Sequence, residues 1–246
     1  MNYLSLALVL IGIAIFPPLP AAMVFNPDED IMTSSFFFPP NSVRGYAGEG
    51  RDVFRVSNNN AFGITGAETI YLSFQSADLS SYVNPIERAI LTMTSVDGGF
   101  NANASGGNPF TVSAHAVDTN PITSITDDTN PGGTIDWLTF YNLNIQTASP
   151  ESFVAVEGFG QIEFDVTSIV NDWISGANNE LSIALTGKND TSGNDFLHGF
   201  LNNTETPGST FLTINPIPEP TTGILALVGL ALALRGRRRQ SLDSQS

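Results

Sequence analysis

Apolar and polar residues alternate over short stretches through most of this chain. The segments 70–74, 89–93 and 110–116 each place alternate apolar side chains on one face. A two-residue period indicates a β-strand with one buried face. Further stretches of this kind lie at 153–156, 161–164, 181–186, 196–200 and 211–214. Clusters of Gly, Pro and Asn stand between the stretches, where turns are expected.

The middle of the chain is therefore predicted to be all-β. Many short strands separated by turn signals are typical of a β-sandwich or a jelly roll. We find no internal repeat in the sequence and no linker long enough to divide the middle region. We expect residues 23–215 to form this single jelly-roll-like sandwich domain.

One stretch follows a helical period instead. The apolar residues that share one helical face are those at positions 166, 169, 170, 173 and 174. Asp165 or Thr167 can cap the start of this helix, and Gly176 suits its end. We expect one short helix near 167–174 that closes one end of the sandwich, with Trp173 filling the core.

An apolar run from Leu4 to Phe16 stands in the N-terminal part of the chain, and two prolines follow it. The length of this run suits a secretory signal peptide, and the small residues up to Ala22 suit cleavage at that point. The run departs from the usual pattern because no Lys or Arg precedes it. We expect residues 1–22 to be a signal peptide, and a buried N-terminal helix is the alternative.

The C-terminal segment 216–246 contains a proline-rich motif, an apolar run and a basic cluster. The motif is Pro218, Glu219 and Pro220, and the basic cluster is Arg235, Arg237, Arg238 and Arg239. Guanidinium groups resist transfer through hydrocarbon, so the cluster stays cytoplasmic and the body lies outside the cytoplasm. The apolar run Gly223–Leu234 is shorter than the roughly 20 residues of a comfortable membrane span. A segment that inserts transiently and is then removed is therefore favoured over an ordinary tail anchor.

These three parts, in this order, resemble the PEP-CTERM sorting signal of Gram-negative and related bacteria. The resemblance implies that secretion machinery exports the protein and that its C-terminal helix enters the inner membrane transiently. It also implies that an exosortase, a membrane-embedded transpeptidase-like enzyme, processes the chain near Pro218, Glu219 and Pro220. The protein would then reside in the cell envelope, on the outer surface or in the extracellular matrix.

The chain without its two ends is strongly acidic. The middle domain carries 22 acidic and five basic residues, a net charge of −17. Nucleic-acid binding through phosphates needs clustered Lys and Arg, so that class of function is excluded. The chain contains no cysteine, which excludes disulfides, thiolate metal sites and cysteine nucleophiles. The domain must therefore rest on its own hydrophobic core, for which about 190 residues suffice.

The Asp-Val-Thr stretch 165–167, followed by Trp173, belongs to a wider pattern in the middle domain. The pattern covers the stretches 71–80, 85–91, 164–173, 178–185 and 200–214. It resembles DNRLRE-type domains, although Ser73 and Glu180 stand where that family has Arg and Gly. The resemblance implies a jelly-roll sandwich, surface display and, in some members, carbohydrate binding.

Hard oxygen ligands gather in two expected loops. Asp190, Asn194 and Asp195 surround a glycine in one loop, and Asp127 and Asp128 are adjacent in another. Ca²⁺ takes such carboxylate and amide oxygens, although neither loop has the twelve-residue EF-hand spacing. Ca²⁺ is therefore the candidate cofactor, and acidic turns in water are the alternative.

Aromatic residues that stack on sugar rings are the usual feature of carbohydrate-binding modules. Trp137 and Tyr141 flank a stretch expected to be rich in loops, and Tyr46 is a third candidate. Polysaccharide is therefore a candidate partner. The alternative for each ring is a place in the core of the sandwich.

Motifs for catalysis are missing from the sequence, which contains no Gly-x-Ser-x-Gly, His-Glu-x-x-His or phosphate-binding loop. We expect His115 and His198 to be solvated, since they fall at outward or end positions of expected strands. The leading function is a non-catalytic, exosortase-sorted envelope or matrix protein associated with exopolysaccharide or biofilm. The alternatives are a specific carbohydrate-binding module and a polysaccharide-active hydrolase that uses an Asp/Glu pair.

Overall fold

The computed structural model of this chain describes residues 21–34, 43–44, 53–57, 68–82, 85–99, 103–126, 132–145, 149–187 and 196–217. Twelve strands and three helices lie within these ranges. The strands are β1 (Met23–Phe25), β2 (Glu29–Ser34), β3 (Val43–Arg44), β4 (Val53–Ser57), β5 (Glu68–Ser73), β6 (Arg88–Val96), β7 (Phe110–Val117), β8 (Ser152–Val156), β9 (Gly160–Asp165), β10 (Ser182–Gly187), β11 (Leu197–Leu201) and β12 (Thr210–Asn215). The helices are α2 (Pro121–Ser124), α3 (Trp137–Asn144) and α4 (Thr167–Ser175).

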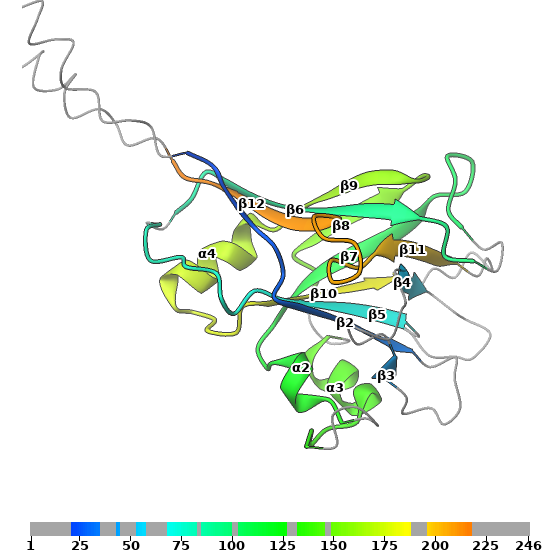
Figure 1. Ribbon diagram of the computed structural model, residues 1–246, viewed down its shortest axis with the longest axis horizontal. Helices are drawn as coiled ribbons and strands as arrows, with labels where there is room; N and C mark the ends of the chain where they lie inside the picture. Colours follow the sequence, from blue (N-terminus) through cyan, green and yellow to red (C-terminus); the bar gives the residue numbers. More distant parts are fainter. Residues whose placement is uncertain are drawn as a thin grey trace, which may run out of the picture. The chain divides into compact units, whose positions relative to one another are not determined.

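Eight of the described strands form two antiparallel layers, which Figure 1 shows one above the other. One layer has the order β1–β12–β6–β9, and the other has the order β5–β10–β7–β8. When these eight strands are numbered along the chain, the layers are 1-8-3-6 and 2-7-4-5, the order of a jelly roll. The predicted all-β, jelly-roll-like sandwich is therefore confirmed.

The remaining four described strands extend and connect these layers. β2 pairs with β5 and carries β3 on its other side. β11 pairs with both β6 and β4, and β4 joins β5 through the single pair Ser57 and Glu68. One continuous hydrogen-bonded path therefore passes from the first layer to the second.

The main core fills the space between the two layers. Among its largest fully buried side chains are Phe54, Phe74, Phe110, Phe164 and Phe200. The rings of Phe110 and Phe196 stack with their centroids 4.8 Å apart. Burial of each large apolar side chain contributes about 1.5–3 kcal/mol to folding, so this cluster is the main source of stability in a domain without disulfides.

A second core lies between the outer face of the β2–β5–β10–β7 layer and the helices α2 and α3, which Figure 1 shows next to this layer. It contains Tyr71 and Ala184 from the sheet and Trp137, Phe140 and Tyr141 from α3. The expectation of a single helix is corrected here, because α2 and α3 are also helical. The three α3 side chains follow the spacing i, i+3, i+4, so the sequence carries a helical signal in this stretch, which we expected to be rich in loops.

The helix expected near 167–174 is confirmed as α4, Thr167–Ser175. It ends at Gly176, whose φ of 75° is the left-handed conformation that favours glycine at this position. Trp173 is only 6% exposed and packs in the main core, with its ring centroid 6.1 Å from that of Phe74. Trp173 is therefore a core residue, as predicted.

Candidate functional site

The last strand of the domain, β12, is held by hydrogen bonds up to its final residue. Its ladder with β6 runs from Thr210, opposite Met93, to Asn215, opposite Arg88. Next to this last pair, the amide N–H of Glu87 donates to the carbonyl oxygen of Asn215 at 3.0 Å. The sandwich therefore fixes the chain up to Asn215, immediately before the C-terminal segment 216–246.

The first strand, β1, lies on the other side of β12. Met23 is opposite Ile214, and Phe25 is opposite Leu212. Residue 22 precedes this ladder and residue 215 follows it, so both ends of the domain leave from the same end of one strand pair, as Figure 1 shows. The side chain of Val24 is 61% exposed on this strand, and β1 has no second partner among the described strands.

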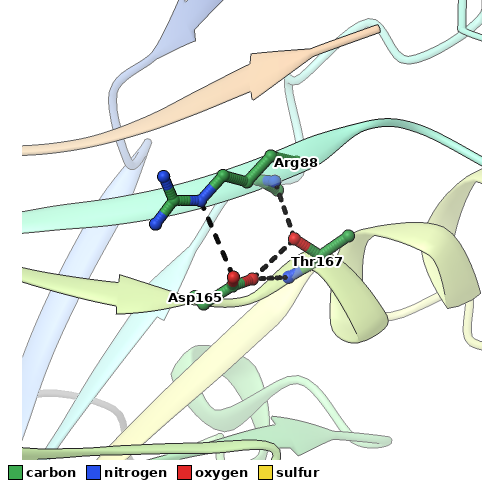
Figure 2. Close-up of polar contacts among 4 residues, drawn as sticks. Arg88, Asp165 and Thr167 are labelled. Carbon is green, nitrogen blue, oxygen red and sulfur yellow. Dashed lines mark hydrogen bonds and ion pairs between the residues drawn. The ribbon is translucent and has the colours of Figure 1, made fainter. Parts of the chain in front are cut away.

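A polar cluster fastens the start of α4 to β6 close to this exit (Figure 2). The Asp165 carboxylate accepts from the Thr167 amide N–H at 3.1 Å and from the Thr167 hydroxyl at 2.6 Å. The Thr167 Oγ1 accepts in turn from the Ala89 amide N–H at 2.9 Å. Val166 is the N-cap of α4 and no side chain makes a capping bond, so the expectation that Asp165 or Thr167 caps the helix is corrected. Asp165 instead holds Thr167, the first residue of α4, and Thr167 ties this turn to the strand that holds β12.

An ion pair completes this cluster. The Nε of Arg88 lies 3.7 Å from Oδ2 of Asp165, and the two side chains are 55% and 56% exposed. An exposed pair of this kind contributes about 0–1 kcal/mol because water screens it and both side chains lose freedom. The hydrogen bonds of Thr167, rather than the ion pair, are therefore the main polar contribution here.

Residues 216–240 match the family described as the PEP-CTERM protein-sorting motif. The match begins at Pro216, directly after the last residue of β12, and includes Pro218–Pro220, the apolar run and the basic cluster. A comparison with curated proteins finds no match. The predicted sorting signal is therefore confirmed: the chain carries a motif that marks exported proteins of the cell envelope or surface for an exosortase.

The sorting segment itself follows the described residues. Pro218, Glu219, Pro220 and the four arginines of the basic cluster lie outside the described ranges, as does the apolar run Gly223–Leu234. Within the described ranges, no helix is long and apolar enough to cross a membrane. The match also does not reach the sandwich, so the resemblance of the middle domain to DNRLRE-type domains stays a prediction.

The aromatic residues proposed to contact sugar lie elsewhere. Trp137 is 0% and Tyr141 is 3% exposed, and both pack in the second core between α3 and the sheet. Neither ring therefore offers a face on which a sugar could stack in this structure, and both occupy the core position that was the other possibility for them. Tyr46 lies outside the described residues.

The candidate calcium ligands Asp127, Asp128, Asp190, Asn194 and Asp195 all lie outside the described residues. Among the residues that the structure describes, no group of three or more His, Asp or Glu side chains could hold a metal ion. The suggestion of a Ca²⁺ site in these two loops therefore stays a prediction from the sequence.

Both histidines are buried, which corrects the expectation that they are solvated. His198 is 0% exposed: its Nδ1 accepts from the Ala104 amide N–H at 3.3 Å, and its Nε2 hydrogen-bonds the Ser95 hydroxyl. Because Nδ1 accepts, the proton of the neutral ring is on Nε2, which donates to Ser95. The Ser95 hydroxyl then donates to the Gly158 carbonyl oxygen at 3.1 Å. In this arrangement His198 is not a base for Ser95, and the pair ties β6 and β11 to the β8–β9 turn.

His115 is 6% exposed on β7, where its Nε2 lies 3.1 Å from the Thr186 hydroxyl on β10. Burial lowers the pKa of His115 to about 4, and it lowers the pKa of His198 to the same value. Both rings are therefore neutral at ordinary pH. The sequence pattern missed their burial for two reasons. His198 lies on the same face of β11 as the main-core residue Phe200, and the outer face of β7, which carries His115, also carries Val117 of the second core.

Sequence reasoning also missed Asp30, a carboxylate that is 1% exposed. It accepts from the Asn203 amide N–H at 2.7 Å and from the Thr204 hydroxyl at 2.9 Å. These bonds hold the connection between β11 and β12. The two strands run in the same direction, and both pair with β6. Burial raises the pKa of Asp30, while the hydrogen bonds it accepts oppose that shift. Its strand has the sequence Glu-Asp-Ile-Met-Thr-Ser, without apolar alternation, so the sequence carried no signal for the burial of Asp30.

Proposed function

We propose that this protein is a non-catalytic component of the bacterial cell envelope or extracellular matrix, which an exosortase sorts through its C-terminal segment. The sandwich is the part that is displayed, and its association is with exopolysaccharide or biofilm. The observation that carries the proposal is the position of the matched motif, which begins at Pro216 where the β12 ladder ends. A folded domain is thus joined directly to a sorting segment.

The composition of the domain supports a displayed, non-enzymatic role. A net charge of −17 over the middle domain favours solubility and repulsion between free copies. The buried Ser95 and His198 pair has the wrong tautomer for a nucleophile and its base. The burial of Trp137 and Tyr141 removes the observation that would have favoured a specific sugar-binding module.

The experiment for sorting compares the full chain in cells with and without an exosortase. Mass spectrometry of the exported protein gives its C-terminus. We expect Arg237, Arg238 and Arg239 to be absent from the product in cells with the enzyme and present in cells without it. Replacing Pro218, Glu219 and Pro220 together by alanine should keep the tail in both strains. A tail that persists in the wild-type protein in the presence of the enzyme would exclude the proposal.

A second experiment addresses the partner. Exported protein is sedimented with exopolysaccharide from the producing cells, and an unrelated exported protein of similar negative charge serves as the control. We expect the sandwich protein to sediment with the polymer in excess of the control. Equal recovery of the two proteins would remove exopolysaccharide as the partner while leaving the sorting result intact.

A further inference from the structure

An open edge of the sandwich carries an inference that is separate from sorting. Among the described strands, β1, β3, β8 and β9 each pair with a neighbour on one side only. The open side of such a strand presents unpaired backbone N–H and C=O groups, which form a template for another strand. Natural proteins usually protect it with charge, proline or very short length.

Three of these four edges are protected. β1 has three residues and β3 has two. β9 has the sequence Gly-Gln-Ile-Glu-Phe-Asp, and its exposed positions include Glu163 and Asp165. A strand added to β9 would therefore lie against two carboxylates. A second copy of this acidic chain would be repelled by them.

β8 has none of these protections. Its five residues are Ser-Phe-Val-Ala-Val, without charge or proline, and the side chain of Phe153 is 71% exposed. A large aromatic ring in water on an open strand of high β-propensity is the combination that strand addition would bury. In a chain with a net charge of −15, the five residues of β8 carry no charge, and the nearest charges along the strand are the exposed Glu151 and Glu157.

We propose that β8 pairs with β8 of a second copy of this chain. The two strands would lie antiparallel about a two-fold axis, so that the β5–β10–β7–β8 layers of both copies join into one continuous sheet. An isologous contact of this kind is the commonest way in which identical subunits associate.

Charge decides the register of the pair. Centring it on Val154 would place Glu151 opposite Glu157 of the second copy, and like charges directly opposite one another are unfavourable. Centring it on Phe153 instead places Glu151 opposite Ala155 of the second copy. It also places the two Phe153 rings against each other, where each covers the exposed surface of the other.

Single cysteines test this register, because the chain has no cysteine of its own. Phe153→Cys is made in the full chain, the cells are treated with a mild oxidant, and dimers are measured on non-reducing gels. We expect a disulfide-linked dimer, since residue 153 faces its own copy. The matched control is Leu143→Cys on α3, which is 67% exposed and lies away from β8.

Ala155→Cys is the register control. It lies on the same face as residue 153, but in the proposed pair the two copies of residue 155 are about 13 Å apart, which is too far for a disulfide. We therefore expect Ala155→Cys alone to form little dimer. When Glu151→Cys and Ala155→Cys chains are mixed, we expect a cross-linked dimer, because these two positions are opposite one another. Because self-repulsion opposes association, the Phe153→Cys dimer should increase with salt.

The proposal is overturned if mixed Glu151→Cys and Ala155→Cys chains, which both keep Phe153, form no more cross-linked dimer than Leu143→Cys does at any salt concentration. It is also overturned if Ala155→Cys dimerises as well as Phe153→Cys, which would indicate random collision, or if Phe153→Cys links to a different protein. As a second measurement, Phe153→Lys should abolish association in sedimentation, whereas Leu143→Lys should leave it unchanged. The same tests in cells without an exosortase keep this result separate from sorting.

Discussion

Met23 of β1 and Ile214 of β12 lie directly opposite one another, so the first and last strands of the sandwich are neighbours. Opposite residues in an antiparallel pair have Cα atoms about 4.5–5.5 Å apart. The segment before residue 22 and the segment after residue 215 therefore both start from one edge of the domain. An enzyme acting at Pro218–Pro220 would have to work within a few residues of this hydrogen-bonded edge.

We expect Trp173→Ala to destabilise the protein strongly, because it leaves a large cavity beside Phe74 in the main core. The free energy of unfolding should fall by about 3–5 kcal/mol. Urea unfolding followed by far-UV circular dichroism, which does not depend on tryptophan, measures this loss. Leu143→Ala, at a position that is 67% exposed, is the control and should change stability by no more than about 0.5 kcal/mol. Equal effects of the two variants would contradict the core position of Trp173.

The cluster at the start of α4 predicts that its hydrogen bonds contribute more to the free energy of unfolding than its ion pair does. Thr167→Val removes the acceptor of the Ala89 amide and the donor to Asp165, and should lower the free energy of unfolding by about 1–3 kcal/mol. Thr167→Ser keeps the hydroxyl and should recover most of this loss. Arg88→Ala removes only the exposed ion pair, and its cost should stay below about 1 kcal/mol. Chemical denaturation measures the loss of stability in the three variants. A larger loss for Arg88→Ala than for Thr167→Val would show that the ion pair is the main polar contribution.

The buried histidines predict a loss of stability in acid. The folded-state pKa of His115 and of His198 is about 4, whereas an unfolded histidine titrates near about 6.5. Between these values the unfolded chain binds protons that the folded chain does not. The free energy of unfolding therefore falls as the pH is lowered through this window, by at most about 3 kcal/mol per histidine.

Denaturant unfolding at several pH values across this window measures how steeply the free energy of unfolding falls with pH. Replacing both histidines by glutamine should make this dependence weaker, although the stability of that variant at neutral pH will be lower. Asp30 cannot cause the loss, because burial raises its folded-state pKa and its protonation therefore favours the folded state. An unchanged slope in the double variant would show that other groups are responsible.

The segment after β6 approaches β11 closely at Gly98, which predicts that Gly98 tolerates no side chain. A Cβ at Gly98 would lie 2.6 Å from the carbonyl oxygen of Leu197 and 2.8 Å from the amide nitrogen of Gly199. Gly98→Ala should therefore destabilise the protein by about 1–3 kcal/mol, as overpacking does. Gly106→Ala is the matched control, since a Cβ at Gly106 would meet nothing within 4 Å. Thermal melts that fail to separate the two variants would contradict the close approach.

The local pattern of the sequence was enough to predict eight of the strands and one helix. Every alternating segment proposed between 70 and 214 lies on a strand, and 167–174 lies on α4. These elements each bury one face, so a period of two or of 3.6 residues records their burial directly. The strands β1 to β4 were not predicted. β2 has the sequence Glu-Asp-Ile-Met-Thr-Ser, which shows no apolar alternation, and its buried Asp30 accepts hydrogen bonds from a distant connection.

The sequence by itself determined the all-β class, α4 with its core tryptophan, and the sorting segment, because each depends on residues close together in the chain. Only the tertiary structure decided that Trp137 and Tyr141 are buried, that both histidines are neutral, and that Phe153 stands on an open edge. It also decided that Met23 and Ile214 are neighbours. These properties depend on which surfaces cover one another, and such long-range contacts are set by the packing of the whole domain.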